Sequence, residues 1–468
     1  MTDPIAPAAP DGVLASLHPD CPDWRRLGPT PRDAAVRALG AAVEIDAQNR
    51  DQQWSKGFTR RRLIQGGAAV GVASIASQLV TSRVSFAANA AAIPGTLIVV
   101  FLRGGMDGLS VLQPASAATG LNVLAGKRSR LLSPTSKLLT LTGGLAGFGL
   151  HPSLAALKPL IAAGRFAAIP AVSTPDVSRS HFQAQDCLER GGSGETGTGT
   201  GWLDRVLQQS GAGTTFRAVA SSSRLPRSLV GSNNAVVVPD LSEMSLDTDQ
   251  PAATIAALRS LYTGVGGPTG LQASIALGAS VTASALAARE KADIEANRRP
   301  VYPANSFAGD LRTLATMISA NIGVRVGSID VGGWDMHTDL IGDMPTLLKS
   351  VADGLSVFFR DLGAKADTTT VVVMSEFGRR MEQNDNAGAD HGHGGVALVM
   401  GGGVRGGVRG RWAGLGPSVL DHGDVPGTND YRTVLGEVVG KRLGLTASQV
   451  GQVFPGFPIG GLRLGVMR

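Results

Sequence analysis

The sequence predicts an α/β domain: a doubly wound, largely parallel sheet flanked by helices. Two observations carry this prediction. Short, continuous runs of apolar and β-branched residues, bounded by glycine, are typical of strands buried on both faces of a sheet. Between these runs, apolar residues recur every three or four positions, which indicates helices that alternate with the strands.

The elements can be placed in chain order. Strands are expected at 96–102, 165–172, 324–331, 369–374 and 396–400. Helices are expected at 153–163, 178–190 and 344–362. A stretch rich in alanine, leucine and serine at about 251–322 predicts a helical insertion. The glycine repeat at 401–410 lacks the Gly-Lys-Ser/Thr ending of a phosphate-binding loop and predicts a tight hairpin.

The N-terminal region indicates export. Residues 59–64 have the twin-arginine form, and a weakly apolar, Gly/Ala-rich stretch and small-residue cleavage sites near Ala90 follow them. We therefore expect a weakly ordered leader at 1–58, a twin-arginine signal peptide at 59–90 and the α/β domain at 91–468. The alternative is an ordinary basic cluster before a buried helix.

This export signal predicts a periplasmic or extracellular protein that meets the twin-arginine translocase. A stable membrane span is not expected, because a span needs about 20 strongly apolar residues and this stretch contains glutamines and many small residues. Removal of the signal would leave Cys187 as the one cysteine, so no internal disulfide is expected. With scattered arginines and three tyrosines, the chain shows no basic stripe or stacking platform, which argues against nucleic acid as a partner.

Polar, glycine-flanked loops follow four of the predicted strands. The carboxyl ends of parallel strands meet at one edge of such a sheet, so these loops should converge there. In chain order the loops carry Asp107; Ser178, Arg179, Ser180 and His181; Asp335 and His337; Glu376 and Arg379. A fifth loop, Asp390–Gly395, precedes its strand instead of following it.

Four of the seven histidines lie in these loops. Imidazole and carboxylate together form the usual ligand set for zinc, manganese or iron. The expected metal ligands are Asp107, Asp335, His337, Glu376, His391 and His393. Two alternatives stand beside this prediction: the aspartates at 107 and 335 could be turn residues, and one histidine of the 391/393 pair could orient the other's partner.

The serine loop predicts a nucleophile. Ser178 and Ser180 stand at a helix start, where free backbone N–H groups favour an anionic group and help to activate a hydroxyl. Ser178 could equally be a helix cap. His181 would move protons or complete the ligand shell. Arg179 or Arg379 would clamp an anionic substrate oxygen, with Arg379 as the substrate-binding residue, or either could be a structural ion-pair partner.

Several motifs in order resemble one family. The runs Phe101–Ser110, Ser178–Phe182, Ser375–Arg379 and Asp390–Gly395 resemble the DUF1501 family of exported bacterial proteins, over about residues 95–465. That family is similar to the alkaline phosphatase–sulfatase superfamily, so the resemblance implies an alkaline-phosphatase-like fold and metal-dependent hydrolysis.

The superfamily pattern maps onto this chain with two departures, and one of them is the Asp-x-His spacing at Asp335, which is shorter than the Asp-x-x-x-His of phosphatases. Asp107, Ser180 or Ser178, Asp335, His337 and His391 or His393 match its roles in order. Glu376-Phe377 stands where an adjacent Asp-His pair is usual. The resemblance therefore implies one metal ion and gives less support to a second.

The function expected from these observations is hydrolysis of a phosphate or sulfate ester. The protein would be exported, would use a divalent ion (Zn, Mn or Ca) and would attack a small-molecule or polymer-linked anionic ester with a serine. The alternative is a non-catalytic, metal-stabilised protein that binds a cell-envelope polymer or a partner protein. A third interpretation is a metal oxidoreductase, since the same ligands suit iron.

Overall fold

The computed structural model describes residues 95–192, 199–211, 213–222, 224–231, 235–238, 241, 299–458 and 463–468. The predicted leader at 1–58, the predicted signal peptide at 59–90 and residues 251–298 of the predicted insertion lie outside the described residues. In the described ranges, no helix is long and apolar enough to cross a membrane.

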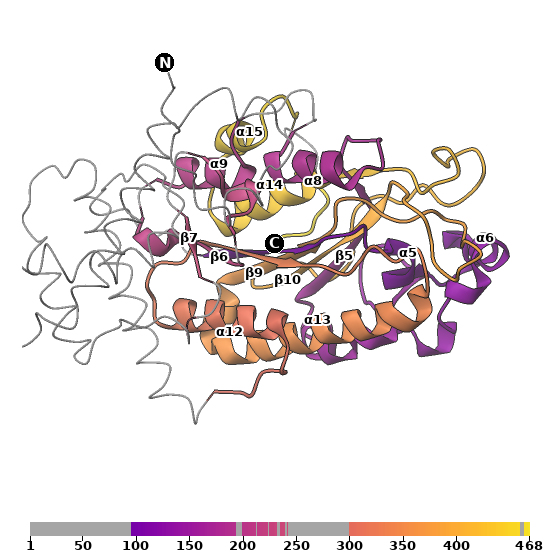
Figure 1. The fold of residues 1–468 in the computed structure, drawn as a ribbon, viewed down its shortest axis with the longest axis horizontal. Helices are drawn as coiled ribbons and strands as arrows, with labels where there is room; N and C mark the ends of the chain where they lie inside the picture. The colour runs from indigo at the N-terminus through magenta and orange to yellow at the C-terminus, as the bar shows by residue number, and fades with distance from the viewer. Residues whose placement is uncertain are drawn as a thin grey trace, which may run out of the picture. The chain divides into compact units, whose positions relative to one another are not determined.

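The described part of the chain forms a nine-stranded mixed sheet in the order β11-β5-β10-β9-β1-β8-β6-β7, with β12 beside β5 (Figure 1). The strands are β1 (Thr96–Leu102), β5 (Phe166–Ser173), β6 (Ala218–Ser221), β7 (Val236–Val237), β8 (Val326–Val331), β9 (Thr369–Met374), β10 (Gly395–Gly401), β11 (Gly407–Val408) and β12 (Asn429–Asp430). In the centre, Val100 of β1 lies opposite Ile329 of β8 and Val373 of β9, both in parallel register. The prediction of a mostly parallel α/β sheet is confirmed.

Strand β10 is the exception to the parallel order. It runs antiparallel to both of its neighbours, β5 and β9. The start of β10 therefore lies at the edge of the sheet where β5 and β9 end. For this reason the loop that carries His391 and His393 reaches the same edge although it precedes its strand.

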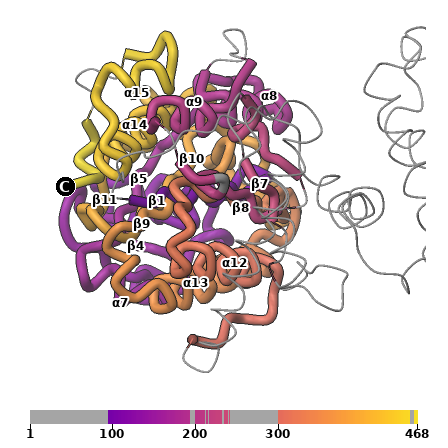
Figure 2. The backbone as a smooth tube through the Cα atoms, turned by 90° about the vertical axis from the view of Figure 1, so that its left-hand side faces the viewer, coloured from indigo at the N-terminus to yellow at the C-terminus, as the bar shows by residue number. Residues whose placement is uncertain are grey.

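Helices cover both faces of the sheet (Figures 1 and 2). One face carries α12 (Ser306–Ser319) and α13 (Leu340–Leu362); the other carries α8 (His181–Arg190), α9 (Trp202–Gln209), α14 (Tyr431–Arg442) and α15 (Ala447–Val453). Alternate residues of β1 enter the two cores, with Val100 on the side of α13 and Val99 on the side of α14. Burial on both faces explains why the strand sequences are continuously apolar.

The remaining α-helices and strands of the described residues lie before α8 in the chain. They are the helices α5 (Gly108–Val111), α6 (Leu121–Lys127) and α7 (Lys158–Ala162), and a small antiparallel sheet of β2 (Leu112–Pro114), β3 (Leu139–Thr140) and β4 (Phe148–Leu150). The helix expected at 153–163 is a 3₁₀ helix at Pro152–Leu157 that continues into α7.

Two expectations about the second half of the chain meet the structure differently. The hairpin prediction for 401–410 is wrong, because β11 pairs in parallel with β5 and not with β10. Helix α12, at the C-terminal end of the predicted insertion, packs against α13 and the sheet. The remainder of that insertion stays a prediction.

Candidate metal centre

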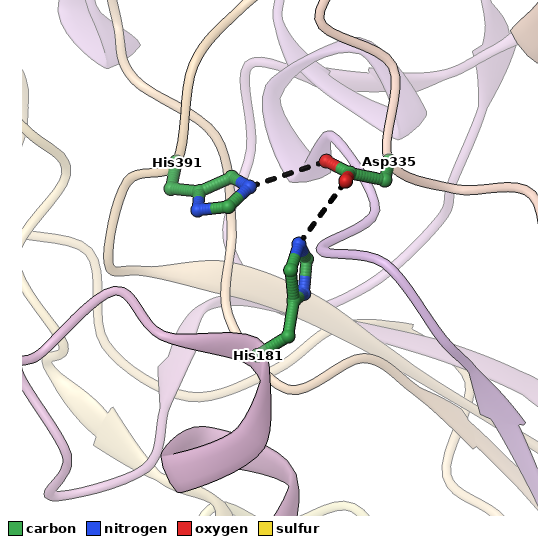
Figure 3. Close-up of side chains that lie close together, drawn as sticks. All are labelled: His181, Asp335 and His391. Atoms are coloured by element: carbon green, nitrogen blue, oxygen red, sulfur yellow. Dashed lines mark hydrogen bonds and ion pairs between the residues drawn. The ribbon is translucent and has the colours of Figure 1, made fainter. Parts of the chain in front are cut away.

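Three side chains from distant parts of the sequence converge at this edge of the sheet (Figure 3). His181 begins α8, Asp335 follows β8, and His391 precedes β10. His181 Nε2 lies 3.3 Å from Asp335 Oδ2, and His391 Nε2 lies 3.1 Å from Asp335 Oδ1. One ligand atom of each residue lies within 4.8 Å of the others, so the group could hold a metal ion.

A third imidazole joins this group. His337 Nε2 lies 3.1 Å from Asp335 Oδ1 and 3.0 Å from His391 Nε2. His337 and Asp335 are two residues apart in the loop after β8, and their side chains meet, as the sequence predicted. The Nε2 atoms of His181, His337 and His391 thus surround one carboxylate.

The other nitrogen of each ring is already bonded. His181 Nδ1 lies 2.8 Å from Glu376 Oε1, and His337 Nδ1 lies 2.8 Å from Asp390 Oδ1. His391 Nδ1 lies 2.8 Å from the carbonyl oxygen of Arg179. Because these partners are acceptors, each Nδ1 donates, and in the neutral ring Nε2 then carries a lone pair. The Nε2 atoms of His181 and His391 and the carboxylate of Asp335 lie close enough together to hold a divalent cation, with His337 beside them.

The pKa shifts favour the ligating form of Asp335 and His391 and oppose it at His181, which would have to give up a proton to a metal ion. The hydrogen bond to Glu376 raises the pKa of His181, against partial burial. Burial lowers the pKa of His391 and so favours its neutral, ligating form. Burial alone would raise the pKa of Asp335, but hydrogen bonds from Arg379 and His391 hold that pKa well below its usual range. Asp335 is therefore a carboxylate at any physiological pH.

Glu376 stands behind His181 and outside the group of three. Its side chain is fully buried, and Oε1 accepts hydrogen bonds from Gly104 N and Gln185 Nε2, both at 2.9 Å, as well as from His181. A carboxylate that accepts from the far nitrogen of a ligating histidine fixes the ring and makes it more basic. The structure thus places Glu376 behind His181 and outside the group that could hold a metal ion, where the sequence predicted a ligand.

Phe377 holds the same two rings by contact. Its ring centroid lies 4.9 Å from that of His181 and 4.9 Å from that of His391. Gly105 permits this packing, because a Cβ there would lie 2.4 Å from the Phe377 ring.

Asp107 does not join the group. It is 2% exposed, and its oxygens accept from Ser110 Oγ and, at 3.0 Å, from the fully buried Arg128. One oxygen forms a buried ion pair with Arg128, and the other accepts from the Ser110 hydroxyl of α5. The turn-residue alternative fits this position better than metal ligation does.

Arg379 has a structural role, and its side chain is not open to a substrate. Its side chain is fully buried and donates to the carbonyl oxygens of Gly104, Gly105, Trp334 and Ala389. It also donates to Asp335 Oδ1 at 2.7 Å. The ion-pair alternative fits this burial, and the predicted role of substrate clamp does not.

His393 lies apart from the other histidines. Its Nδ1 is 3.1 Å from Asp421 Oδ2, and its Nε2 is 3.3 Å from the carbonyl oxygen of Thr174. Both nitrogens therefore point to acceptors other than Asp335. The two histidines of the 391/393 pair serve different partners.

The two serines differ in their bonding. Ser178 Oγ lies 2.6 Å from Asp176 Oδ1 and accepts from Ser180 N at 3.1 Å, so Ser178 shapes the turn before α8. Ser180 is the N-cap residue of α8, but its hydroxyl makes no capping hydrogen bond. Arg179, between them, pairs its side chain with Asp424 and its carbonyl with His391.

Sequence reasoning missed the residues that support the ligands. In the sequence Asp390 is only a neighbour of His391, yet in the fold it serves His337, 53 positions away. The carbonyl of Arg179 and the carboxylate of Asp424 carry no local signal. A search for acceptors behind each ligating histidine could have found Asp390 and Glu376, since both lie in the same motifs.

Comparisons with known proteins identify the family and little more. The family model described as "Protein of unknown function (DUF1501)" matches residues 150–449. The sequence matches that of no curated protein. A solved structure described as "Crystal structure of Ps i-CgsB" aligns with 78% of this chain and 74% of its own, at 10% identity and a TM-score of 0.29, a likeness too weak to carry an argument.

Proposed function

Since this chain belongs to the DUF1501 family, whose description names no reaction, we propose from the site alone that it is a metal-dependent hydrolase of phosphate or sulfate esters. One observation carries the proposal: the Nε2 atoms of three histidines face Asp335 while every Nδ1 is held by an acceptor. A bound divalent ion (Zn, Mn or Ca) would polarise the ester and stabilise its developing charge.

Ser180 is the nucleophile in this proposal. Its hydroxyl makes no capping bond, it adjoins His181, and it stands at the start of the ten-residue helix α8. Free N–H groups at that helix start would bind the anionic oxygens of the ester. Ser178 is less suited, because its hydroxyl is bonded within its own turn.

The wider setting belongs to the same proposal. The Arg60-Arg61 motif supports export by the twin-arginine pathway to the periplasm or beyond. The order of motifs supports kinship with the alkaline phosphatase–sulfatase superfamily, with one metal ion. The substrate would be a small-molecule or polymer-linked anionic ester.

The proposal is tested by metal content and turnover. Protein exported by its native pathway and purified without chelator should contain about one equivalent of a divalent metal by elemental mass spectrometry. Turnover of phosphate or sulfate esters should be lost in Ser180→Ala with metal retained, and should persist in the neighbouring control Ser178→Ala. Metal-free wild-type protein would contradict the proposal.

One observation favours a second candidate, a non-catalytic, metal-stabilised protein that binds a cell-envelope polymer. His337 Nε2 lies 3.1 Å from Asp335 Oδ1, and as a fourth ligand it would fill a tetrahedral shell, whereas His181, Asp335 and His391 alone leave one position open for a substrate. This candidate predicts that chelation lowers the melting temperature sharply and that Ser180→Ala changes nothing.

A further inference from the structure

A tight turn at Asp421–Asp424 lies behind the candidate metal centre. Two backbone hydrogen bonds close it, Asp421 N to Asp424 O at 3.0 Å and Asp424 N to Asp421 O at 2.9 Å. The side chain of Asp424 is fully buried, and it forms ion pairs with Arg179 and, at 3.2 Å, with Arg380 Nε. A buried carboxylate held by two arginines is a fixed anchor point.

Arg179 links this anchor to a metal ligand. Its backbone φ is +57°, in the left-handed region that a non-glycine residue keeps only where its surroundings hold it there. In that conformation its carbonyl accepts from His391 Nδ1 at 2.8 Å while its guanidinium reaches Asp424. Asp424 therefore holds the residue whose carbonyl orients His391.

The same turn also binds the two segments beside His391. The carbonyl of His422 accepts from Arg380 Nη2 at 3.0 Å, and the carbonyl of Val425 accepts from Gly394 N at 2.9 Å. Asp421 adds a contact with His393 at 3.1 Å. Two parts of the chain that are far apart in sequence, the loop of Arg179 and the stretch Arg380–Gly394, are thus fastened to one turn.

We propose that Asp424 is a positioning residue of the metal centre. It keeps the Arg179 carbonyl on His391 Nδ1, which holds that ring in the tautomer whose Nε2 lone pair faces Asp335. Without the anchor, the serine loop can leave its left-handed conformation and the ring loses its fixed direction. This inference rests on the metal site proposed above.

The test is the zinc affinity of chelator-stripped, refilled, full-length protein, measured by competition with a zinc indicator. Asp424→Asn, which keeps the shape and removes the charge, should weaken zinc binding about 10- to 100-fold, the usual effect of losing a residue behind a ligand. Arg179→Ala should weaken zinc binding to the same extent. It removes the guanidinium but keeps a Cβ, so residue 179 still disfavours the left-handed conformation. The double variant should be little worse than either single one, because both changes break one link.

A matched control comes from a second buried aspartate. Asp361 of α13 is 2% exposed and pairs with Arg299 at 2.8 Å, in a network that also includes Tyr302. Asp361→Asn should lower the melting temperature as Asp424→Asn does, but it should leave the zinc affinity unchanged. A purely structural role for Asp424 would make these two variants behave alike.

The outcomes separate this inference from the proposed function. Wild-type protein that binds none of zinc, manganese and calcium overturns both. Zinc binding that is equally tight in wild type and Asp424→Asn overturns the positioning role and leaves the metal site standing. If Asp424→Asn does not fold, Arg179→Ala decides, because its side chain is 35% exposed; an unchanged zinc affinity there overturns the inference.

Discussion

The Nε2 atoms of His337 and His391 lie 3.0 Å apart, although the two residues are 54 positions apart in sequence. Each ring already donates its Nδ1 proton, one to Asp390 and the other to the carbonyl of Arg179. Two neutral rings would then face each other with lone pairs, so either one Nε2 is protonated or a cation lies between them. This pair therefore marks the point where metal and proton compete.

Substitutions of His391 and Asp107 should have different effects on metal binding. His391→Ala removes a ligand atom and should abolish metal binding. Asp107→Asn should keep the metal, because its carboxylate serves Arg128; it should lower the free energy of unfolding by about 3 kcal/mol, since a buried arginine loses its charged partner. Elemental mass spectrometry and urea unfolding measure the two effects. Loss of metal in Asp107→Asn would place Asp107 among the ligands.

The pH dependence of metal binding should move with Glu376. The hydrogen bond to Glu376 raises the pKa of His181 above 6.5. A metal must displace that proton, so zinc affinity should rise as pH increases through the pKa of His181. In Glu376→Gln that pKa falls, and the midpoint of the pH curve should shift to lower pH. At high pH the variant should still bind about 10- to 100-fold more weakly, because the ring is no longer held.

In the metal-free protein, the raised pKa of His181 should make the free energy of unfolding depend on pH. A histidine whose folded pKa is raised stabilises the fold fully below its unfolded pKa, and this contribution is lost as pH rises through the folded pKa. Unfolding of wild type and Glu376→Gln at several pH values between about 5.5 and 8.5 measures it. The His181 contribution should shrink in the variant at the acidic end. If the pH midpoint is the same in wild type and Glu376→Gln, Glu376 does not control the titration of His181.

Gly104→Ala should loosen the loop that holds Asp335. Gly104 has φ +123°, and a Cβ there would lie 2.5 Å from Asp335 N. We expect a loss of about 1–3 kcal/mol in the free energy of unfolding, together with weaker metal binding. Gly126→Ala in α6 is the control, since a Cβ there would extend into open space with nothing within 4 Å. It should be neutral or stabilising.

Cys187 should be unreactive in the folded protein. The thiol is 0% exposed, and burial raises its pKa to about 11. At pH 8 it is therefore protonated and shielded, and iodoacetamide should modify it only after denaturation. Peptide mass spectrometry of the Cys187 fragment distinguishes it from Cys21. Rapid modification of the native protein would show that α8 opens readily.

The sequence predicted the strands at 96–102, 324–331 and 369–374 well, because burial on both faces leaves a continuous apolar run. It also predicted that the loops after these strands would meet. Apolar runs carry no direction, however. The reversal of β10, which explains the place of the His391 loop, could not be predicted from its composition.

Side-chain roles were harder to predict than positions. Asp107 and Arg379 stand in motifs that suit ligand or substrate contacts. In the folded protein, however, both side chains form buried hydrogen bonds with other residues. Arg128 reaches Asp107 across 21 positions, and Arg379 reaches Gly104 across 275. Such pairings depend on the packing of separate loops, and no local spacing encodes them.

The place of β10 in the sheet has a consequence for how the protein is made. Among the strands of the described residues, β5 joins the central strands only through β10, which begins at Gly395, more than 200 residues after β5 ends. During synthesis, β5 therefore cannot pair with the central strands until β10 has left the ribosome. A chain stopped before residue 395 would expose the open edges of β5 and β9, and such edges invite aggregation.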